Sequence, residues 1–378
     1  MIELQKNDTE KYLLLAVRLP GMGAYETEKS LDELAALAET AGAVEVGRLI
    51  QRLDRFDPNT YLGEGKVLEA AQILEETEAT GVLCDDELSP AQMRGLSEKL
   101  GCKVIDRTIL ILDIFAAHAK TNEGKLQVEL AQLKYRASHL SGLGTSLSRQ
   151  GGGIGTRGPG ETKLESDKRA IRTKIGRLAK RVKEMEQVRD VGRKQRVRNR
   201  VPVAAIVGYT NAGKSTLLGR LSGAEVFAKD MLFATLDPLT RKCRIPVPGE
   251  EGVTDYLTGP EVLLTDTVGF INKLPHQLID AFRSTLEEAK YADLLIHVAD
   301  ASDPDLDKHL AVVYDTLADL GASDKPVLTV WNKTDLIPEE TELHDPKAFR
   351  TVRISAKTGT GMEGLYAALA AMIRENAE

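Results

Sequence analysis

The chain has 378 residues, 42% of them hydrophobic and 28% charged, which is ordinary for a globular protein of two or three domains. No apolar run is long enough to cross a membrane, the N-terminus lacks the pattern of a secretion signal, and the three cysteines and six histidines are scattered. These features argue against a membrane span, a disulfide framework and a His/Cys metal centre, and they favour a cytoplasmic protein.

Residues 12–118 alternate between strand-like and helix-like segments. Short apolar stretches, partly β-branched, predict strands at residues 12–19, 43–54, 81–86 and 102–106. The stretches between them have helical spacing, at residues 30–42, 65–80 and 89–101, and Ser89 followed by Pro90 is a helix start signal. We therefore predict an N-terminal α/β domain, residues 1–118, with a small and largely parallel sheet.

The next segment, residues 119–199, combines helical apolar spacing with a strong excess of positive charge. Between Lys120 and Arg200 there are 21 lysines and arginines against 8 acidic residues, although the whole chain has a net charge of −7. Such a segment is a candidate partner of polyanions; the alternative is a solvated charged helix. Two apolar stripes predict an antiparallel helical hairpin. They consist of Leu126, Leu130, Leu133, Ala137, Leu140 and Leu147, and of Leu164, Ile171, Ile175, Leu178, Val182 and Met185.

The connection between these two helices, GGGIGTRGPGETK at residues 151–163, contains the glycine spacing of a dinucleotide-binding loop. That loop requires a strand before it, whereas a helix is predicted here. We therefore reject a dinucleotide site in this segment.

From residue 200 onward the strand–helix alternation returns. Strands are predicted at residues 201–208, 242–248, 261–267, 294–300, 326–332 and 349–355, and a helix at 361–375. Residues 241–267 resemble an antiparallel hairpin inserted into an otherwise parallel sheet. This pattern predicts a doubly wound α/β domain over residues 200–378.

GYTNAGKS, residues 208–215, satisfies the G-x-x-x-x-G-K-[ST] pattern between an apolar strand and a helix. Glycines let backbone N–H groups curl around phosphates, and the helix N-terminus adds favourable partial charge. We expect Lys214 to reach the β- and γ-phosphates as a catalytic group and Ser215 to ligate Mg²⁺. The expected phosphate-binding residues are Gly208, Tyr209, Thr210, Asn211, Ala212, Gly213, Lys214, Ser215 and Thr216.

Three further motifs end predicted strands. DTVG at residues 266–269 places Asp266 to reach Mg²⁺ through water and Gly269 to offer its N–H to the γ-phosphate as a catalytic group. NKTD at 332–335 places Asp335 to accept the N1–H and amine of guanine, which adenine does not offer. SAK at 355–357 can supply an N–H to the guanine O6. The predicted GTP site also includes Thr267, Val268, Asn332, Lys333, Ser355, Ala356 and Lys357.

MLFATLDPLTRK, residues 231–242, occupies the expected position of a mobile switch. We expect the Thr235 hydroxyl to ligate Mg²⁺ and its N–H to sense the γ-phosphate, with Phe233 and Ala234 beside the nucleotide. Thr240 is the alternative to Thr235.

Taken together, these motifs resemble those of a known family. The segments FATLDP and DTVGF, and above all RQGGGIGTRGPGETKLESDKR at residues 149–169, are similar to those of HflX, a bacterial GTPase associated with ribosomes. The resemblance covers about residues 10–375. It implies an N-terminal domain ending in a helical hairpin, a GTPase domain, binding to the large ribosomal subunit and splitting of stalled ribosomes. Some family members carry a further C-terminal domain, for which this chain leaves little room.

The resemblance also bears on hydrolysis of GTP to GDP and phosphate. Ras-like GTPases place a glutamine after DxxG to orient the attacking water, whereas this position is Phe270. Phe270 predicts slow hydrolysis unless another group positions the water, and the resemblance implies activation by the ribosome. Asn211 matches an asparagine that helps to hold potassium in some related GTPases; the alternative is that it only braces the switch.

The resemblance gives the glycine-rich segment a role at the hairpin tip. Because glycines allow close approach of the backbone and the flanking charge is positive, we expect residues 151–160 to enter a groove of ribosomal RNA. The alternative is a flexible connector. The expected RNA contacts are Arg149, Gly151, Gly152, Gly153, Gly155, Arg157, Gly158, Gly160 and Lys163.

Two other functions stay open at this stage. One is an ATP-driven, helicase-like RNA-remodelling protein with an adenine site in the N-terminal domain. The other is a regulatory GTP switch that acts through a protein effector. The function favoured by the motifs and the resemblance is a GTPase that binds GTP, Mg²⁺ and the large ribosomal subunit. We expect this protein to be a monomer.

Overall fold

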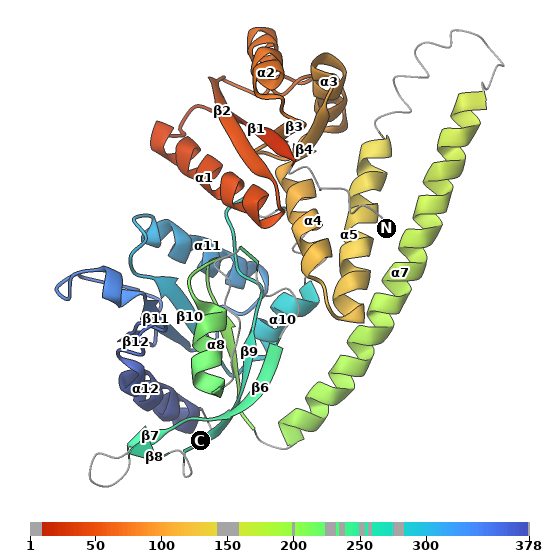
Figure 1. The fold of residues 1–378 in the computed structure, drawn as a ribbon. Helices are drawn as coiled ribbons and strands as arrows, with labels where there is room; N and C mark the ends of the chain where they lie inside the picture. Colours follow the sequence, from red (N-terminus) through yellow and green to blue (C-terminus); the bar gives the residue numbers. More distant parts are fainter. Residues whose placement is uncertain are drawn as a thin grey trace, which may run out of the picture. The chain divides into compact units, whose positions relative to one another are not determined.

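The computed structural model describes residues 10–141, 159–198, 201–223, 232–233, 239–248, 254–255, 259–273, 275 and 283–376. The chain forms two compact units (Figure 1). The first contains residues 1–117, 125–182 and 275–278, and the second contains residues 118–124, 183–274 and 279–378. The division into three domains at residues 118 and 199 stays a prediction, because a single helix runs from the first unit into the second.

The first unit contains a four-stranded parallel sheet, as predicted. Its strands are β1 Lys11–Arg18, β2 Val44–Arg52, β3 Gly81–Cys84 and β4 Lys103–Asp106, in the order β2-β1-β3-β4. The apolar run from Tyr12 to Val17 is buried throughout, which is typical of a parallel strand covered on both faces.

Four helices complete the α/β part of this unit: α1 Ala24–Thr40, α2 Glu64–Thr77, α3 Pro90–Leu100 and α4 Arg107–His118. Helix α3 begins as expected, because the Ser89 hydroxyl accepts from the Gln92 N–H and the Gln92 side chain accepts from the Ser89 N–H. Helix α4 was not predicted. Its sequence, RTILILDIFAAH, is apolar on nearly all sides, so it lacks the periodicity that marks a helix on a surface.

Two long helices follow, α5 Asn122–Ser141 and α7 Pro159–Arg198. Ion pairs join them in opposite sequence order, Glu123 with Arg189 at 2.8 Å and Glu129 with Lys174 at 2.7 Å. Five residues of the predicted apolar stripes are buried: Leu126, Leu130, Leu133, Leu178 and Val182. Residues 142–158 lie outside the described part of the chain, so the hairpin as a whole stays a prediction.

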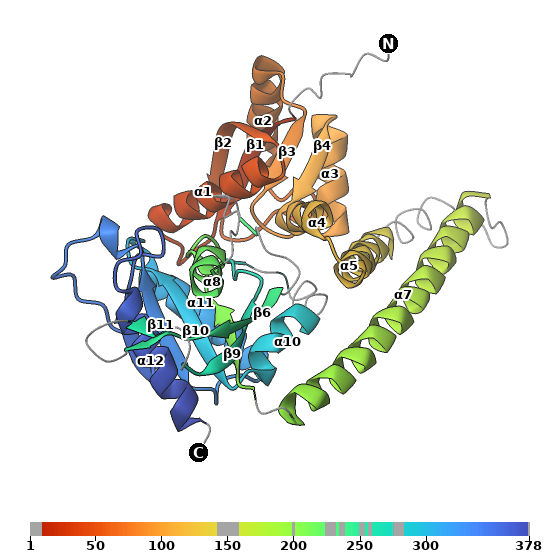
Figure 2. The same ribbon diagram turned by 60° about the horizontal axis from the view of Figure 1, so that its bottom comes forward.

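The second unit contains the predicted doubly wound sheet (Figure 2). The strand order is β12-β11-β10-β5-β9-β6, with β6 antiparallel and the others parallel. The strands are β5 Val203–Val207, β6 Leu239–Arg244, β9 Glu261–Asp266, β10 Leu294–Asp300, β11 Val327–Asn332 and β12 Arg350–Arg353. The helices are α8 Lys214–Ser222, α10 Arg283–Tyr291, α11 Leu306–Asp319 and α12 Met362–Glu375, with a 3₁₀ turn at Thr334–Leu336.

The predicted strand at residues 242–248 is two strands. The chain leaves β6 at Arg244 and continues as β7 Val247–Pro248, which pairs with β8 Thr254–Asp255. Pro246 lies at the break, where a residue without an N–H cannot continue the ladder. Among the helices that the structure describes, none could span a membrane.

Candidate nucleotide-binding site

The phosphate loop lies between β5 and α8, as its motif predicts. Gly208 has a φ of 151°, and a Cβ there would lie 2.2 Å from the carbonyl oxygen of Val298 in β10. Gly213 has a φ of 97°, and a Cβ there would lie 2.2 Å from the Asn332 amide nitrogen. Both positions therefore require glycine, for conformation and for space.

Lys214 is the buried cation of this loop, with 7% of its surface exposed. Its Nζ donates a hydrogen bond to the Tyr209 carbonyl oxygen at 2.7 Å. Burial lowers its pKa to about 8, although the charge of Asp266 opposes the shift. An anion placed beside this amine would stabilise the ammonium form that burial disfavours.

The next residue, Ser215, faces the end of β9. Its hydroxyl donates to Oδ2 of Asp266 at 2.8 Å, and Asp266 is 1% exposed. A hydroxyl and a carboxylate are the hard oxygen donors that Mg²⁺ prefers, and Mg²⁺ in nucleotide sites is held by one or two such groups together with phosphates. The pair therefore fits the metal that the sequence predicts.

The DTVG segment continues as an extension of the sheet beside the phosphate loop. The Thr210 N–H donates to the Phe270 carbonyl at 2.7 Å, and the Phe270 N–H donates to the Gly208 carbonyl at 3.1 Å. The Phe270 side chain is 1% exposed. Its ring thus belongs to the core and offers no polar atom that could orient a water.

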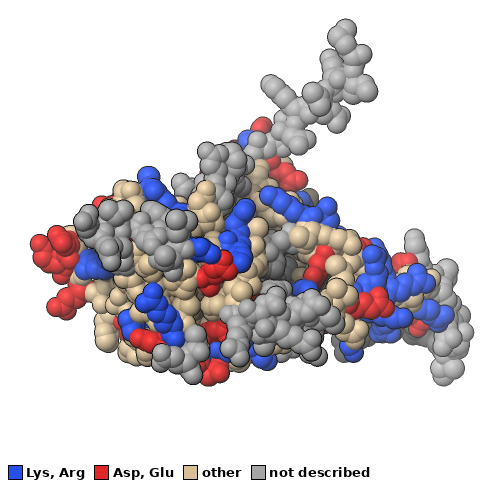
Figure 3. All heavy atoms as spheres, turned by 90° about the horizontal axis from the view of Figure 1, so that it is seen from below, with Lys and Arg blue, Asp and Glu red and all other residues tan. Residues whose placement is uncertain are grey.

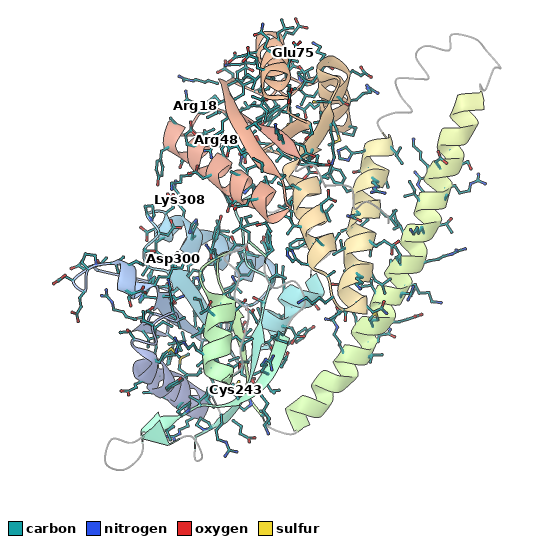
Figure 4. All side chains as sticks on the ribbon, in the orientation of Figure 1. Arg18, Arg48, Glu75, Cys243, Asp300 and Lys308 are labelled. Atoms are coloured by element: carbon teal, nitrogen blue, oxygen red, sulfur yellow. The ribbon has the colours of Figure 1, made fainter. Side chains whose placement is uncertain are left out.

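NKTD connects the phosphate loop to SAK. The Asn332 amide donates to the Ala212 carbonyl and accepts from the Ala356 N–H, each at 2.8 Å. Lys333, with a φ of 61°, pairs with Asp300 at 2.7 Å, and Asp300 ends β10 (Figure 4). Asp335 is exposed. Its carboxylate therefore becomes buried only when a ligand covers it.

Some residues that shape this site carry no recognisable sequence signal. Arg220 in α8 donates from Nε to the Ala356 carbonyl at 3.0 Å and from Nη2 to the Lys357 carbonyl at 2.5 Å. It thus holds the SAK loop from the helix that follows the phosphate loop. Nothing in the local pattern distinguishes it from a solvated arginine, because its partners lie more than 130 residues away.

Several predicted residues cannot be placed. Ala234 and Thr235 lie outside the described residues, whereas Phe233 is described and is buried. The alternative, Thr240, lies in β6, and its hydroxyl is 3.0 Å from that of Thr265 in β9. Of the expected RNA contacts, Arg149, Gly151, Gly152, Gly153, Gly155, Arg157 and Gly158 are also outside the described residues, and Gly160 and Lys163 fall in α7.

Comparison with known proteins identifies three family matches between residues 28 and 333. Residues 28–116 match a family described as the N-terminal part of GTP-binding GTPases, and residues 118–196 match its middle region. Residues 203–333 match a family described as 50S ribosome-binding GTPases. Nothing in these matches favours the ATP-driven or the effector-only alternative.

Individual relatives agree. The GTPase HflX of Lacrimispora saccharolytica is 53% identical over 375 residues, which cover 99% of this chain and 85% of that protein. The GTPase HflX of Escherichia coli is 43% identical, over 90% of this chain and 78% of that protein. The crystal structure of the SsGBP–GDP complex is 26% identical, with a TM-score of 0.52 over 98% of this chain and all of that one. The chain thus belongs to the HflX family of GTPases, and its second unit is a P-loop domain that binds and hydrolyses GTP.

Proposed function

We propose that the nucleotide lies across the carboxyl ends of the second sheet, as the motifs predict. Backbone N–H groups of residues 208–216 and the Lys214 ammonium bind the phosphates, and Gly269 donates its N–H to the γ-phosphate. Ser215, Thr235 and, through water, Asp266 hold Mg²⁺, which neutralises charge on the phosphates. The hydroxyl–carboxylate contact of Ser215 with Asp266 supports this assignment.

The guanine base lies against Asp335 and the SAK loop in this proposal. Asp335 accepts from the guanine N1–H and amine. Within SAK, the Ser355 N–H already donates to Thr360 and the Ala356 N–H to Asn332. The Lys357 N–H is therefore the donor that we assign to the guanine O6.

We further propose that the protein binds the large ribosomal subunit and dissociates stalled ribosomes. The observation that carries this proposal is the surface of α7, where lysines and arginines crowd together (Figure 3). Seven of these side chains are exposed: Arg169, Arg172, Lys174, Arg177, Lys180, Arg181 and Lys183. They share the helix with the buried Leu178 and Val182, so one face is held by packing while these cations lie on the exposed faces, where phosphates can approach them.

Co-sedimentation with purified large subunits tests the binding. With a non-hydrolysable GTP analogue, the protein should pellet with subunits at low salt and dissociate as salt rises. The variant Arg177→Glu/Arg181→Glu should lose most of this binding while its GTP affinity stays normal. Charge reversal at Lys29 and Lys99, exposed lysines of the first unit's α/β part, is the matched control. Equal binding by both variants would rule out α7 as the contact.

Two further measurements separate the roles of the tip and of the ribosome. Replacement of residues 148–160 by a short neutral turn should leave GTP affinity intact and abolish ribosome splitting. If splitting survives, the tip of the hairpin is only a connector.

Single-turnover GTP hydrolysis by the protein alone should be slow, because Phe270 cannot orient water, and it should be faster with large subunits. Equal rates with and without large subunits would show that a group within the protein orients the water.

A further inference from the structure

Tyr209, the second residue of the phosphate loop, contacts three other parts of the second unit. Its ring stacks on His309 of α11, with centroids 3.7 Å apart and an interplanar angle of 12°. Its hydroxyl accepts a hydrogen bond from the Asn272 N–H at 2.8 Å. Its carbonyl accepts from Lys214. One residue thus joins α11, the segment after DTVG and the buried lysine.

Among the described residues, three hydrogen bonds hold residues 270–272 against the phosphate loop, and we call these three bonds the clasp. Two of them join main-chain groups, from Thr210 to Phe270 and from Phe270 to Gly208. The third, from Asn272, uses the Tyr209 hydroxyl. Because this bond alone depends on a side chain, it can be removed without changing the course of the backbone.

The clasp holds Gly269 close to Lys214 and Thr210. A Cβ built on Gly269 would lie 2.9 Å from Lys214 Nζ and 2.8 Å from Thr210 Cγ2. The proposed function assigns the γ-phosphate to the Lys214 ammonium and the Gly269 N–H. A γ-phosphate placed between these two groups has to separate Gly269 from the loop, whereas GDP has no third phosphate to place there.

We propose that Tyr209 is a positioning residue that sets the preference between GDP and GTP, by holding the clasp closed through its hydroxyl. The proposal rests on the assignment of the γ-phosphate to Lys214 and Gly269. His309 keeps the tyrosine ring in place, and Asp303, whose Oδ2 is 3.5 Å from His309 Nδ1, holds the imidazole. A ligand shifts such an equilibrium only by its different affinity for the two states, and the γ-phosphate supplies that difference.

The test compares Tyr209→Phe with the wild type, using fluorescent GDP and a fluorescent non-hydrolysable GTP analogue. Loss of one hydrogen bond from the closed state should raise the ratio of GTP-analogue to GDP affinity about two- to tenfold. His309→Ala should shift the ratio in the same direction, and His309→Phe, which keeps a stacked ring, should restore it. Tyr314→Phe is the matched control, because it removes a 2.7 Å hydroxyl bond to Asp345 elsewhere in the unit. It should leave the ratio unchanged.

An unchanged ratio in Tyr209→Phe, or equal changes for both nucleotides, would overturn the role of the hydroxyl. The same shift in Tyr314→Phe would also overturn it, since the effect would then be general destabilisation. Lys214→Ala distinguishes an error in the phosphate assignment from an error in the role of the clasp. If that variant binds GTP normally, the phosphate assignment itself is wrong; if it fails and Tyr209→Phe is normal, only the clasp is wrong.

Discussion

The four-stranded sheet of the first unit and the six-stranded sheet of the second use the carboxylates at their strand ends in opposite ways. In the first unit, Asp85 follows β3 and pairs with Arg107 at 2.8 Å, and Asp106 ends β4 and accepts from Tyr135 and two backbone N–H groups. In the second unit, Asp266 ends β9 and Asp335 follows β11, but Asp266 faces a serine hydroxyl and Asp335 is exposed.

The difference lies in what surrounds the strand ends. Arg107 begins α4 and Tyr135 belongs to α5, so the carboxylates of the first sheet fix helices in place. The second sheet has a glycine-rich loop at the same edge, directly before helix α8. Strand-end carboxylates therefore do not define a site; the loop beside them does.

The largest effect should come from breaking the buried pair of the first sheet. Arg107→Ala leaves Asp85, 1% exposed, without its 2.8 Å cation and should lower the free energy of unfolding by about 3–5 kcal/mol. Lys99→Ala removes a pair with Glu64 at the surface and should cost about 1 kcal/mol or less. Urea unfolding compares the two. Similar losses would mean that burial does not distinguish these ion pairs.

A change beside the second sheet should reduce GTP hydrolysis. Lys214→Ala removes the buried ammonium expected to bind the β- and γ-phosphates, and hydrolysis should fall by about a hundredfold or more. Single-turnover assays with labelled GTP measure it. Arg107→Ala, measured at a temperature where it is folded, serves as the control from the other sheet. Normal turnover in Lys214→Ala would show that the phosphate loop is misassigned.

Base recognition offers a smaller and more specific test. Asp335→Asn exchanges a double acceptor for a group that donates as well, and should weaken GTP binding by about 2–4 kcal/mol. Asp324→Asn, an exposed carboxylate ahead of β11 at the other end of the strand, should have no effect. If the preference for guanine over adenine nucleotides persists in Asp335→Asn, another group reads the base.

Some parts of the fold and of the site could be predicted from the sequence, and others could not. The phosphate loop was predictable because its pattern is contiguous in the chain, and because the positive φ of Gly208 and Gly213 is a local constraint that selects glycine. Helix α4 was missed because burial on most sides removes its periodicity. Arg220 and His309 were missed because their partners, the SAK carbonyls and the Tyr209 ring, come from distant parts of the chain. Chemistry within a motif is readable, whereas contacts between segments depend on the fold.

The two units also bury titratable groups in different ways. In the first unit, Arg107 of α4 is buried in ion pairs. In the second, β10 buries His297, 1% exposed, with its ring edge-on to Tyr314 at 5.4 Å. Burial lowers the pKa of His297 to about 4, although the charge of Asp345 opposes this shift. The folded protein therefore keeps this imidazole neutral under conditions in which an unfolded chain protonates it.

The lowered pKa of His297 makes the folded protein less stable at low pH. The unfolded state takes up this proton near pH 6.5 and the folded state only near pH 4, so stability is full above pH 6.5 and falls as the pH drops towards 4. The loss assigned to His297 is about 2–3 kcal/mol. His297→Phe keeps an aromatic ring against Tyr314 and should show a correspondingly flatter curve in urea unfolding between pH 7 and 4. Parallel curves for wild type and His297→Phe would show that the imidazole is solvated or charged in the folded state.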